Sequence, residues 1–416
     1  MDASVFNYRN GDLMVEDIRL RSLAESLGTP LYVYSTQAIQ TNFRAYQQAF
    51  VGRPYLIAYS VKAASNLAIL RLIQREGGGC DIVSGGELAR ALKAEVDPQK
   101  IVFSGVGKTA LEMAAALKAG ILSFNVESAP ELRLLSATAQ SLGRKAPISL
   151  RVNPDVDPQT HPYVATGLRE SKFGLPVGEA YQLYLQAKND PGLEIVGVDC
   201  HIGSQLTSVG PFQAAAERLL VLMSQLKAAG INLKLLDLGG GLGIDYHGEK
   251  IPPVAEYAQA FRAIYAAFPG LTIILEPGRS VVGAAAVLLV TVLYDKITPY
   301  KRFIITDGGM NDLIRPSLYG SYHVIKPVKD LDRPLTQVNV VGPICESGDF
   351  LAQDRALPLV EAGETLAVFG AGAYGFSMSS NYNSRPRPAE VLVSGSTCRV
   401  IRARETSEDL IRGESF

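Results

Sequence analysis

The sequence predicts an α/β protein in which a TIM-like (β/α)8 barrel is joined to a β-rich Greek-key or sandwich domain. Two observations predict this fold. Between residues 55 and 278, short apolar runs alternate with turns of small or polar residues and with longer segments of helical periodicity. Beyond residue 283, β-rich runs alternate with Pro and Gly turns. With 416 residues, of which 47% are hydrophobic, the chain can bury a sizeable core.

The first region contains about eight βα units. Such alternation indicates a parallel sheet covered by helices, and eight units in this length suit a closed barrel better than an open sheet. A barrel carries its active site at the carboxyl ends of its strands, where Lys62, Asp81, Arg151, His201 and Glu276 stand. The apolar runs are YLIAYSV (55–61), GCDIVS (79–84), KIVFSG (100–105), ILSFNV (121–126), ISLRVN (148–153), LEIVGVDCH (193–201), LKLLDLG (233–239) and LTIILEPG (271–278).

The second region is typical of an antiparallel domain. Its runs are AAAVLLVTVLYDK (284–296), KRFIITDGG (301–309), LTQVNVVGPIC (335–345), ETLAVFGAGAY (364–374) and AEVLVSGSTCRVIRA (389–403). We expect the early run LYVYS (31–35) to add a strand to this domain before the barrel begins. The predicted organisation is therefore 1–33 as the N-terminal part of the β-domain, 34–283 as the cofactor-binding barrel and 284–416 as the C-terminal β-domain.

Charge and cysteine content restrict the function. Lys and Arg number 40, Asp and Glu 41, and the net charge is −1. We predict no nucleic-acid partner, because no basic patch is present, and no membrane contact, because no apolar run reaches a bilayer-spanning length. The N-terminus lacks a basic segment followed by an apolar core, which predicts a cytoplasmic protein. The cysteines lack CxxC spacing, which argues against disulfides and metal sites; they are Cys80, Cys200, Cys345 and Cys398.

Lys62 stands where an apolar run gives way to small polar residues, in AYSVKAASNLAIL (58–70). An ammonium that leaves water normally neutralises, finds a partner or is used chemically. One interpretation is a lysine that extends its ammonium to the surface at a strand end. The other is a lysine that forms a Schiff base with a carbonyl ligand. The stretch alone leaves both interpretations open.

Two glycine-rich segments resemble nucleotide-binding motifs without completing them. SGVGKTA (104–110) ends like a P-loop, but the GxxxxGK[ST] pattern requires glycine at position 102, which is Val102. GAGAYG (370–375) matches GxGxxG after a predicted strand, yet no convincing helix or βαβ unit follows. Neither segment predicts a nucleotide site.

DLGGGLGIDY (237–246) is a better candidate for an anion site than these two segments, because consecutive glycines let backbone N–H groups approach a phosphate. The alternative is a tight turn, which would need the same glycines for positive φ. HIGSQ (201–205) supplies His201 and Ser204. His201 is either a hydrogen-bonded structural residue or an imidazole that stacks on the aromatic ring of a cofactor. EPGR supplies Glu276 and Arg279, either a salt bridge or a pair that binds two parts of one ligand.

One ligand satisfies all of these residues. It needs a carbonyl for Lys62, a phosphate for the glycines, a flat ring for His201 and a basic ring nitrogen for Glu276. Pyridoxal 5′-phosphate (PLP) has all four. Its protonated pyridine nitrogen, stabilised by Glu276, makes the ring an acceptor for the electrons that remain when a bond to Cα breaks.

The motifs of this chain resemble those of the diaminopimelate decarboxylases, a family of alanine-racemase-like, fold type III PLP enzymes. Ala64 departs from the asparagine of many relatives. The motifs that carry the resemblance, in the expected order, are YSVKA, SKFG (171–174), HIGSQ, GGGLG, EPGR, DGGMNDLIRPSLY (307–319), GPICESGD (342–349) and GAGAYGFSMSSNYNSRPRPAEVLV (370–393).

The resemblance implies PLP as cofactor, an amino acid as the small-molecule substrate, and a head-to-tail homodimer with a shared active site. It implies catalytic roles for Lys62, as the Schiff-base lysine, and Cys345, as the proton donor. The implied cofactor-binding residues are Lys62, His201, Ser204, Gly240, Gly241, Glu276, Pro277, Gly278, Arg279 and Tyr374. The implied substrate-binding residues are Arg279, Arg315, Tyr319, Glu346 and Tyr374.

Charge count favours diaminopimelate as the substrate. An ornithine-type decarboxylase must neutralise only a distal ammonium, whereas diaminopimelate carries a complete amino-acid centre at its far end. Arg279 and Arg315 supply cations for that carboxylate, and Glu346 supplies an anion for the ammonium. Cys345 and Glu346 are adjacent and would point in opposite directions in an extended segment, so both reach one site only if the backbone bends there. The alternative to a proton donor at position 345 is a cysteine buried in the core.

The predicted reaction is PLP-dependent decarboxylation of meso-2,6-diaminopimelate to L-lysine, the last step of lysine biosynthesis. Two alternatives stay open at this point: a related decarboxylase of ornithine, arginine or carboxynorspermidine, and a PLP-binding homologue without catalysis.

Overall fold

The chain folds into two compact units. A computed structural model describes residues 5–157 and 171–416. The barrel unit comprises Asn42–Gly243 and Lys250–Ser280, and the β-rich unit comprises Met1–Thr41, Ile244–Glu249 and Val281–Phe416. The segment Ile244–Glu249 therefore leaves the barrel unit between two of its elements and belongs to the β-rich unit. The sequence did not predict this excursion.

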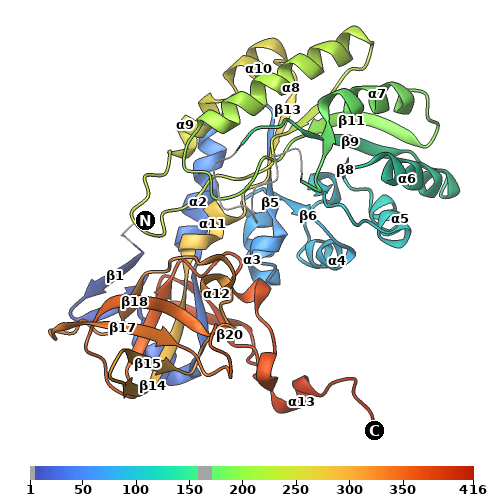
Figure 1. The fold of residues 1–416 in the computed structure, drawn as a ribbon. Helices are drawn as coiled ribbons and strands as arrows, with labels where there is room; N and C mark the ends of the chain where they lie inside the picture. Colours follow the sequence, from blue (N-terminus) through green and yellow to red (C-terminus); the bar gives the residue numbers. More distant parts are fainter. Residues whose placement is uncertain (1–4, 158–170) are drawn as a thin grey trace. The chain divides into compact units, whose positions relative to one another are not determined.

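Over the described residues, the barrel unit is a closed ring of eight parallel strands (Figure 1). Neighbouring strands pair in chain order, and the ring closes between the last strand and the first. The predicted fold class is confirmed, since each of the eight apolar runs forms one barrel strand. The strands are β5 (Tyr55–Ser60), β6 (Gly79–Ile82), β7 (Ile101–Phe103), β8 (Ser123–Val126), β9 (Ala146–Asn153), β11 (Leu193–Asp199), β12 (Leu235–Asp237) and β13 (Thr272–Leu275). The short β10 (Leu175–Pro176) pairs with β9 outside the ring.

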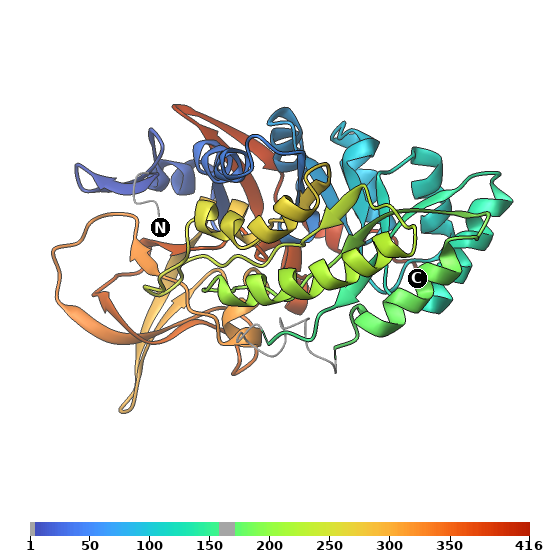
Figure 2. The same cartoon turned by 90° about the horizontal axis from the view of Figure 1, so that it is seen from above.

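Several barrel helices begin at a polar cap shortly after a strand ends. Asn66, Ser84, Thr109 and Ser128 each accept a hydrogen bond from a backbone N–H of the first turn. These caps keep the βα loops short. In Figure 2 the longest helix, α8, runs beside α10. The helices are α3 (Leu67–Arg75), α4 (Gly85–Lys93), α5 (Ala110–Ala119), α6 (Ala129–Ser141), α7 (Val177–Ala187), α8 (Gly210–Ala228), α9 (Val254–Gln259) and α10 (Arg262–Ala267), while α2 (Thr36–Ala49) links the units.

Within the described residues, the β-rich unit is built on a nine-stranded sheet. Seven strands follow the order β18-β17-β15-β14-β4-β20-β21; β19 pairs with β14, and β16 pairs with β19. The pairs β15–β17 and β20–β4 are parallel, and the others are antiparallel. The run LYVYS forms β4, so its predicted place in this domain is confirmed. The strands are β4 (Leu31–Ser35), β14 (Ala286–Ile297), β15 (Arg302–Thr306), β16 (Ile325–Pro327), β17 (Leu335–Val341), β18 (Phe350–Pro358), β19 (Thr365–Phe369), β20 (Ala389–Ser394) and β21 (Thr397–Arg402).

The N-terminal segment covers one side of this sheet. It forms a small antiparallel sheet, β1 (Phe6–Arg9), β2 (Asp12–Val15) and β3 (Ile18–Arg19), followed by α1 (Leu20–Leu27). Its apolar side chains, among them Leu13 and Leu20, pack with Val33 of β4 and Val391 of β20 into one core. Burial of these side chains supplies the free energy that attaches the segment to the unit.

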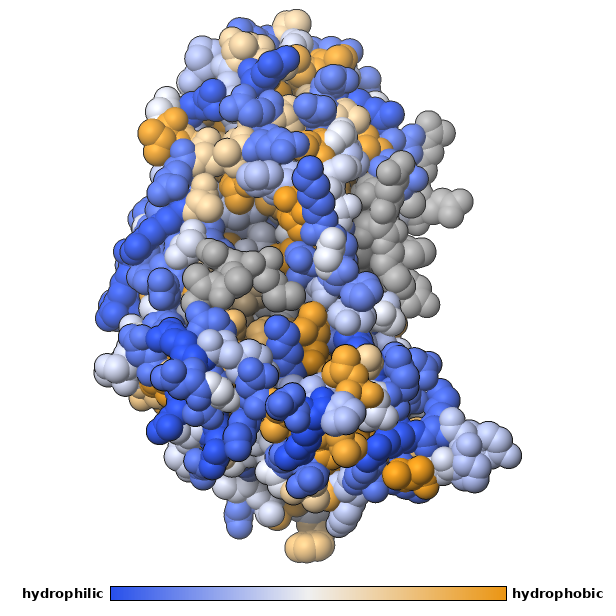
Figure 3. All heavy atoms as spheres, turned by 90° about the vertical axis from the view of Figure 1, so that its left-hand side faces the viewer, coloured by the Kyte–Doolittle hydropathy of each residue, from blue (hydrophilic) through white to orange (hydrophobic). Residues whose placement is uncertain are grey.

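The described helices include none with the length and hydropathy needed to cross a bilayer. On the face drawn in Figure 3, hydrophilic residues dominate and hydrophobic residues form small, separate groups. Large exposed hydrophobic side chains such as Leu111, Val221 and Tyr300 stand far apart in the sequence. Scattered apolar residues of this kind are normal on a protein surface.

Candidate active site

Lys62 lies in the single turn η1 (Val61–Ala63) that follows β5, at the carboxyl end of the barrel. Its Nζ is 3.2 Å from Oδ2 of Asp81, and 41% of its side chain is exposed. Asp81 is fully buried at the end of β6, and its Oδ2 also accepts a hydrogen bond of 2.7 Å from Ser60. A buried carboxylate thus anchors the ammonium beside the barrel mouth while leaving it accessible. The sequence placed Asp81 at a strand end but did not predict its contact with Lys62.

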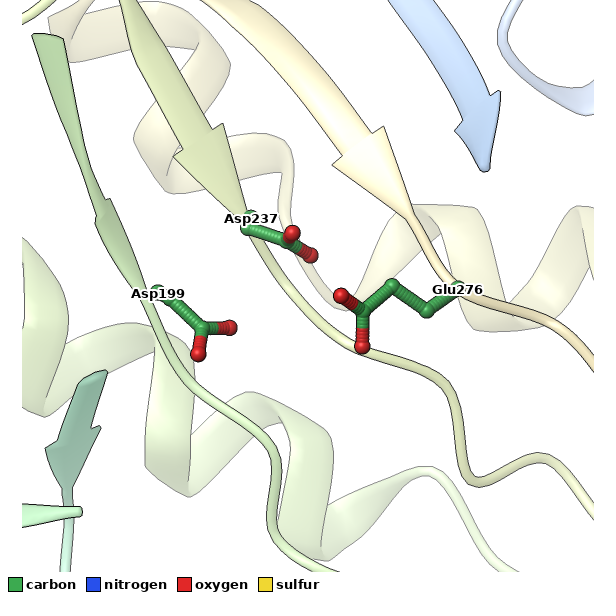
Figure 4. A group of neighbouring side chains, drawn as sticks. All are labelled: Asp199, Asp237 and Glu276. Carbon is green, nitrogen blue, oxygen red and sulfur yellow. The ribbon is translucent and has the colours of Figure 1, made fainter. Parts of the chain in front are cut away.

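Glu276 follows β13, and its buried carboxyl group lies among other buried acids. Among the described residues, Asp199, Asp237 and Glu276 bring carboxylate oxygens within 4.8 Å of one another (Figure 4). Burial, reinforced by Asp237, Asp81 and Asp199, raises the pKa of Glu276 well above its usual value. Burial also raises the pKa of Asp237 to about 6, against the opposing hydrogen bond from Gly239. The buried acids thus disfavour a charge on Glu276 in the protein alone, and a positively charged ligand group would relieve this.

Polar side chains from neighbouring strands hold this acid cluster in place. Asn125 Nδ2 donates to Oδ2 of Asp237 over 3.2 Å and to Oγ of Ser104 over 3.1 Å. Ser104 Oγ in turn donates to Oε1 of Glu276 over 3.3 Å. These residues stand at the ends of four different strands. Sequence analysis missed Asn125, Ser104 and Asp237, although a polar residue at the end of each apolar run was a signal for them.

His201 follows β11 and contacts the glycine loop. Its Nδ1 accepts a hydrogen bond of 3.2 Å from the backbone N–H of Gly240. Burial, with Arg151 and Lys62 nearby, lowers the pKa of His201 well below its usual value. The imidazole is therefore neutral and flat, which suits stacking on an aromatic ring.

The glycines after β12 have no room for side chains. Gly239 and Gly241 have φ of +63° and +118°, so a turn with positive φ accounts for these two positions. Gly240 does not need positive φ, but a Cβ there would lie 2.3 Å from the carbonyl oxygen of Glu276. At Gly240 the requirement is therefore close approach of two backbone segments. The interpretation as a turn with positive φ holds at Gly239 and Gly241, and the phosphate site stays a prediction.

The EPGR segment packs against the turn that carries Lys62. The carbonyl of Pro277 accepts a hydrogen bond of 3.2 Å from the N–H of Ser60, and a Cβ on Gly278 would lie 3.0 Å from Cβ of Ala63. Arg279 begins α11 (Arg279–Val282) and donates from Nε and Nη2 to Oγ of Ser204, over 3.2 and 3.0 Å. The predicted barrel residues, from Lys62 to Arg279, thus gather at the strand ends of one unit.

The remaining predicted residues belong to the β-rich unit. Arg315 and Tyr319 begin and end α12 (Arg315–Tyr319), and Tyr374 follows β19 with φ of 57°. Non-glycine residues rarely adopt this left-handed conformation.

Cys345 and Glu346 lie in the loop between β17 and β18. Cys345 is exposed, so the alternative of a buried core cysteine is wrong. The N–H of Glu346 donates to the carbonyl of Ile344 over 2.8 Å, which bends the backbone at this point. The bend expected from the adjacency of Cys345 and Glu346 is confirmed. Asp349 fixes the loop by accepting hydrogen bonds from the N–H groups of Ile344 and Met310, over 2.6 and 2.7 Å.

Neither of the two rejected nucleotide motifs forms a nucleotide site. Lys108 of SGVGKTA is buried, and its Nζ donates to the carbonyls of Gly105 and Asn125 and to Glu131, over 2.7, 2.8 and 2.7 Å. This lysine is structural. GAGAYG is followed by the single turn Phe376–Met378 rather than by the helix of a βαβ unit.

The barrel residues fit PLP. Glu276 is buried among acids, so a protonated ring nitrogen would supply the positive partner that this carboxylate needs. Asp81 Oδ1 and Asp199 Oδ1 are buried without a hydrogen-bond partner, which marks a site with unused acceptors. The three consecutive glycines at 239–241 carry no side chains that would keep a phosphate away from their backbone. Lys62 offers an accessible amine beside them.

Fold and site together define a PLP-binding decarboxylase barrel. Residues 36–283 match the family described as pyridoxal-dependent decarboxylase, pyridoxal binding domain. The diaminopimelate decarboxylase of Pseudomonas aeruginosa is 52% identical over 411 residues, which cover 99% of both chains. That of Haemophilus influenzae is 49% identical over 411 residues, again 99% of both. The chain therefore belongs to the diaminopimelate decarboxylase family, whose cofactor is pyridoxal phosphate.

Solved structures agree with this assignment. Diaminopimelate decarboxylase from M. jannaschii, in complex with L-lysine, superposes with a TM-score of 0.95 at 40% identity, covering 100% of this chain and 98% of the other. The Helicobacter pylori enzyme, also with L-lysine, gives 0.91 at 46% identity, covering 94% and 98%. A lysine/ornithine decarboxylase from Vibrio vulnificus shares the fold at 20% identity, with a TM-score of 0.80 over 90% of this chain and 97% of the other.

Proposed function

We propose that this chain decarboxylates meso-2,6-diaminopimelate to L-lysine and carbon dioxide with PLP, as the last step of lysine biosynthesis. The observation that carries the proposal is the buried Glu276 beside the accessible Lys62 in a barrel whose relatives, matched over 99% of their length, are diaminopimelate decarboxylases. When bound, PLP supplies a ring that accepts the electrons left as the bond from Cα to the carboxylate breaks.

The barrel residues position the reacting groups. Lys62 would hold the cofactor through its accessible Nζ, which Asp81 positions at the barrel mouth. The imidazole of His201 would pack against the cofactor ring, and the carboxyl group of Glu276 would stabilise a protonated ring nitrogen. The glycine loop at Gly240 and Gly241 would lie against the phosphate, with the N–H of Gly241 and the hydroxyl of Ser204 as donors, because the N–H groups of Gly239 and Gly240 donate to Asp237 and His201. Burial of Glu276 strengthens its interaction with a cation, because little water competes for it.

The β-rich unit supplies most of the groups that bind the distal end of the substrate. Arg315, with Arg279, binds the distal carboxylate, and Glu346 binds the distal ammonium. Tyr319 and Tyr374 complete the binding residues, and the Cys345 thiol delivers the proton that replaces carbon dioxide on Cα. Exposure of Cys345 and the bent loop around it support this role, because they let the thiol reach a second surface.

That second surface belongs to another copy of the chain. We propose a homodimer in which Cys345 and Glu346 of one protomer complete the site of its partner. Both residues lie on the loop between β17 and β18, outside the barrel that carries Lys62. We also propose that the enzyme works in the cytoplasm. All four cysteines lie within the described residues and are unpaired, which suits a reducing compartment.

One assay tests the proposed reaction. Purified protein with PLP is offered meso-diaminopimelate, ornithine, arginine and carboxynorspermidine, and carbon dioxide release is measured. We expect release from meso-diaminopimelate, with L-lysine as the product. A higher kcat/KM for one of the other substrates would assign the chain to a related decarboxylase. No release from any substrate, with PLP bound, would indicate the non-catalytic homologue.

A further inference from the structure

Arg315 is clamped by three side chains of its own unit. The residue is buried, with 5% of its surface exposed. Its Nη1 donates to Oη of Tyr246 over 2.7 Å, and its Nη2 donates to Oγ of Ser321 over 3.2 Å. Nη1 also lies 3.5 Å from Nε2 of His323. The guanidinium carbon stands 4.8 Å from the centre of the Tyr246 ring. These contacts fix both the position and the plane of the guanidinium.

The hydrogen bonds of His323 determine its tautomer. His323 is fully buried, and its Nδ1 lies 2.8 Å from the carbonyl oxygen of Phe369, which only accepts. Nδ1 therefore carries the hydrogen. In the neutral ring the lone pair is then on Nε2, which faces the donor Nη1 of Arg315. A backbone carbonyl of β19 thus orients an acceptor toward Arg315.

Close packing holds both rings. Tyr246 and His323 meet edge to face, with ring centres 5.4 Å apart and planes at 72°. Gly370, with φ of +66°, comes so close that a Cβ there would lie 3.0 Å from Cε1 of Tyr246 and 3.7 Å from Nδ1 of His323. Tyr246 comes from Ile244–Glu249, the segment that leaves the barrel unit. The segment Ile244–Glu249 therefore supplies one of the side chains that hold Arg315, namely Tyr246.

We infer that Tyr246 and His323 are positioning residues that aim the guanidinium of Arg315 at the distal carboxylate of the substrate. The inference rests on the proposed function, because it takes the role of Arg315 from there. A planar guanidinium binds a carboxylate through two parallel hydrogen bonds, so its affinity depends on the direction of the plane. A guanidinium that rotates freely before binding would have to be immobilised by the substrate, and this loss of entropy would lower the affinity for the carboxylate.

Two product-like inhibitors isolate the carboxylate. L-lysine retains the distal carboxylate of the substrate, and 1,5-diaminopentane (cadaverine) is lysine without it. The ratio of their inhibition constants, cadaverine over lysine, therefore measures recognition of this carboxylate by the PLP-loaded enzyme. Arg315→Ala, the reference variant, is expected to lower the ratio, and Arg279 accounts for the recognition of the carboxylate that remains.

Three variants test the positioning residues. Tyr246→Phe keeps the ring and removes the 2.7 Å hydrogen bond. His323→Asn keeps a donor for the Phe369 carbonyl but has no group at the Nε2 position, whereas the longer amide of His323→Gln places an oxygen there. We expect the ratio to fall about tenfold in Tyr246→Phe and in His323→Asn, because hydrogen bonds to charged groups have about that effect, and to recover in His323→Gln. Cadaverine inhibition and PLP absorbance are expected to stay unchanged.

The double variant Arg315→Ala with His323→Asn is expected to match Arg315→Ala alone, because His323 acts through Arg315. An unchanged ratio in Tyr246→Phe and His323→Asn, where Arg315→Ala lowers it, would overturn the inference and leave the proposed function intact. Equal weakening of both inhibitors would also overturn it, since it indicates a structural role. A wild-type enzyme that shows no preference for lysine and no release of carbon dioxide from diaminopimelate would instead refute the proposed function.

Discussion

At the scale of single residues, two lysines show how environment separates chemistry from structure. Lys108 has its ammonium fully buried, with two carbonyls and Glu131 as acceptors. Lys62 contacts the buried Asp81 but keeps 41% of its side chain exposed. An amine in hydrogen bonds to three fixed acceptors cannot reach a carbonyl ligand, whereas an accessible amine can. Exposure, more than the surrounding motif, distinguishes the two.

We predict that Lys62 alone binds PLP covalently. The PLP-loaded protein is expected to be yellow, and borohydride reduction is expected to fix the cofactor on Lys62, as peptide mass spectrometry would show. Lys62→Ala is expected to lose both the colour and the label, whereas Lys108→Met serves as a control that keeps them. A label on Lys108 would refute the assignment.

Asp312 gives a prediction for pH dependence. It is 1% exposed, and burial raises its pKa to about 7, although Gly309 N–H donates to it over 3.0 Å. The native protein therefore holds a proton that the unfolded chain releases near pH 4. Because the native state binds more protons between pH 4 and pH 7, its free energy of unfolding falls as pH rises through that window.

Asp312→Asn removes this titration. We expect wild type to lose roughly 2 kcal/mol relative to Asp312→Asn between pH 5 and pH 7. Urea unfolding of both proteins at several pH values, followed by a signal from the β-rich unit, measures the difference. Parallel pH profiles for the two proteins would show that Asp312 does not carry a raised pKa.

The sequence identified residues that stand inside recognisable local patterns, and it missed those defined by contacts across the fold. Lys62, His201 and Glu276 each follow an apolar run directly, so their place at the barrel mouth could be predicted. Asp237 and Asn125 are 112 residues apart in the chain and meet at 3.2 Å, a proximity that no local pattern encodes. The raised pKa of Glu276 depends on that arrangement and on burial.

At the scale of elements, the glycine loop after β12 yields a prediction. A Cβ on residue 240 would lie 2.3 Å from the Glu276 carbonyl oxygen, so Gly240→Ala must push apart the loop and the EPGR segment. We expect PLP affinity to fall at least tenfold, as measured by titrating the cofactor-free protein. The matched control is Gly107→Ala, where a Cβ would meet nothing within 4 Å and no positive φ is required. Equal affinities for the two variants would show that the loop tolerates displacement.

Elements with a uniform environment were the easier ones to predict from sequence. Most barrel strands are largely buried on both faces and read as runs dominated by apolar residues, as in β5 or β13. Strand β18, FLAQDRALP, mixes buried and exposed positions without regular alternation, and β1 to β3 are short. These strands exist because partners pair with them, and sequence analysis did not identify them.

At the scale of the whole molecule, the division into units has consequences for the active site. Lys62, His201 and Glu276 belong to the barrel unit, whereas Cys345 and Glu346 belong to the β-rich unit. The homodimer with a shared site stays a prediction from the family resemblance. A shared site nevertheless makes a quantitative prediction, because two inactive chains would carry complementary defects.

We predict that Lys62→Ala and Cys345→Ala are each nearly inactive and that mixing them restores activity. In a heterodimer, one site combines the intact Lys62 of the second chain with the intact Cys345 of the first, and the other site carries both defects. If the subunits exchange at random, half of the dimers are heterodimers with one working site of two, so about a quarter of wild-type activity is expected. Differently tagged chains that co-purify would prove exchange, and Lys62→Ala mixed with wild type is the control for dilution. If exchange is proven and activity stays at the level of the separate variants, Cys345 acts within its own chain and the site is not shared.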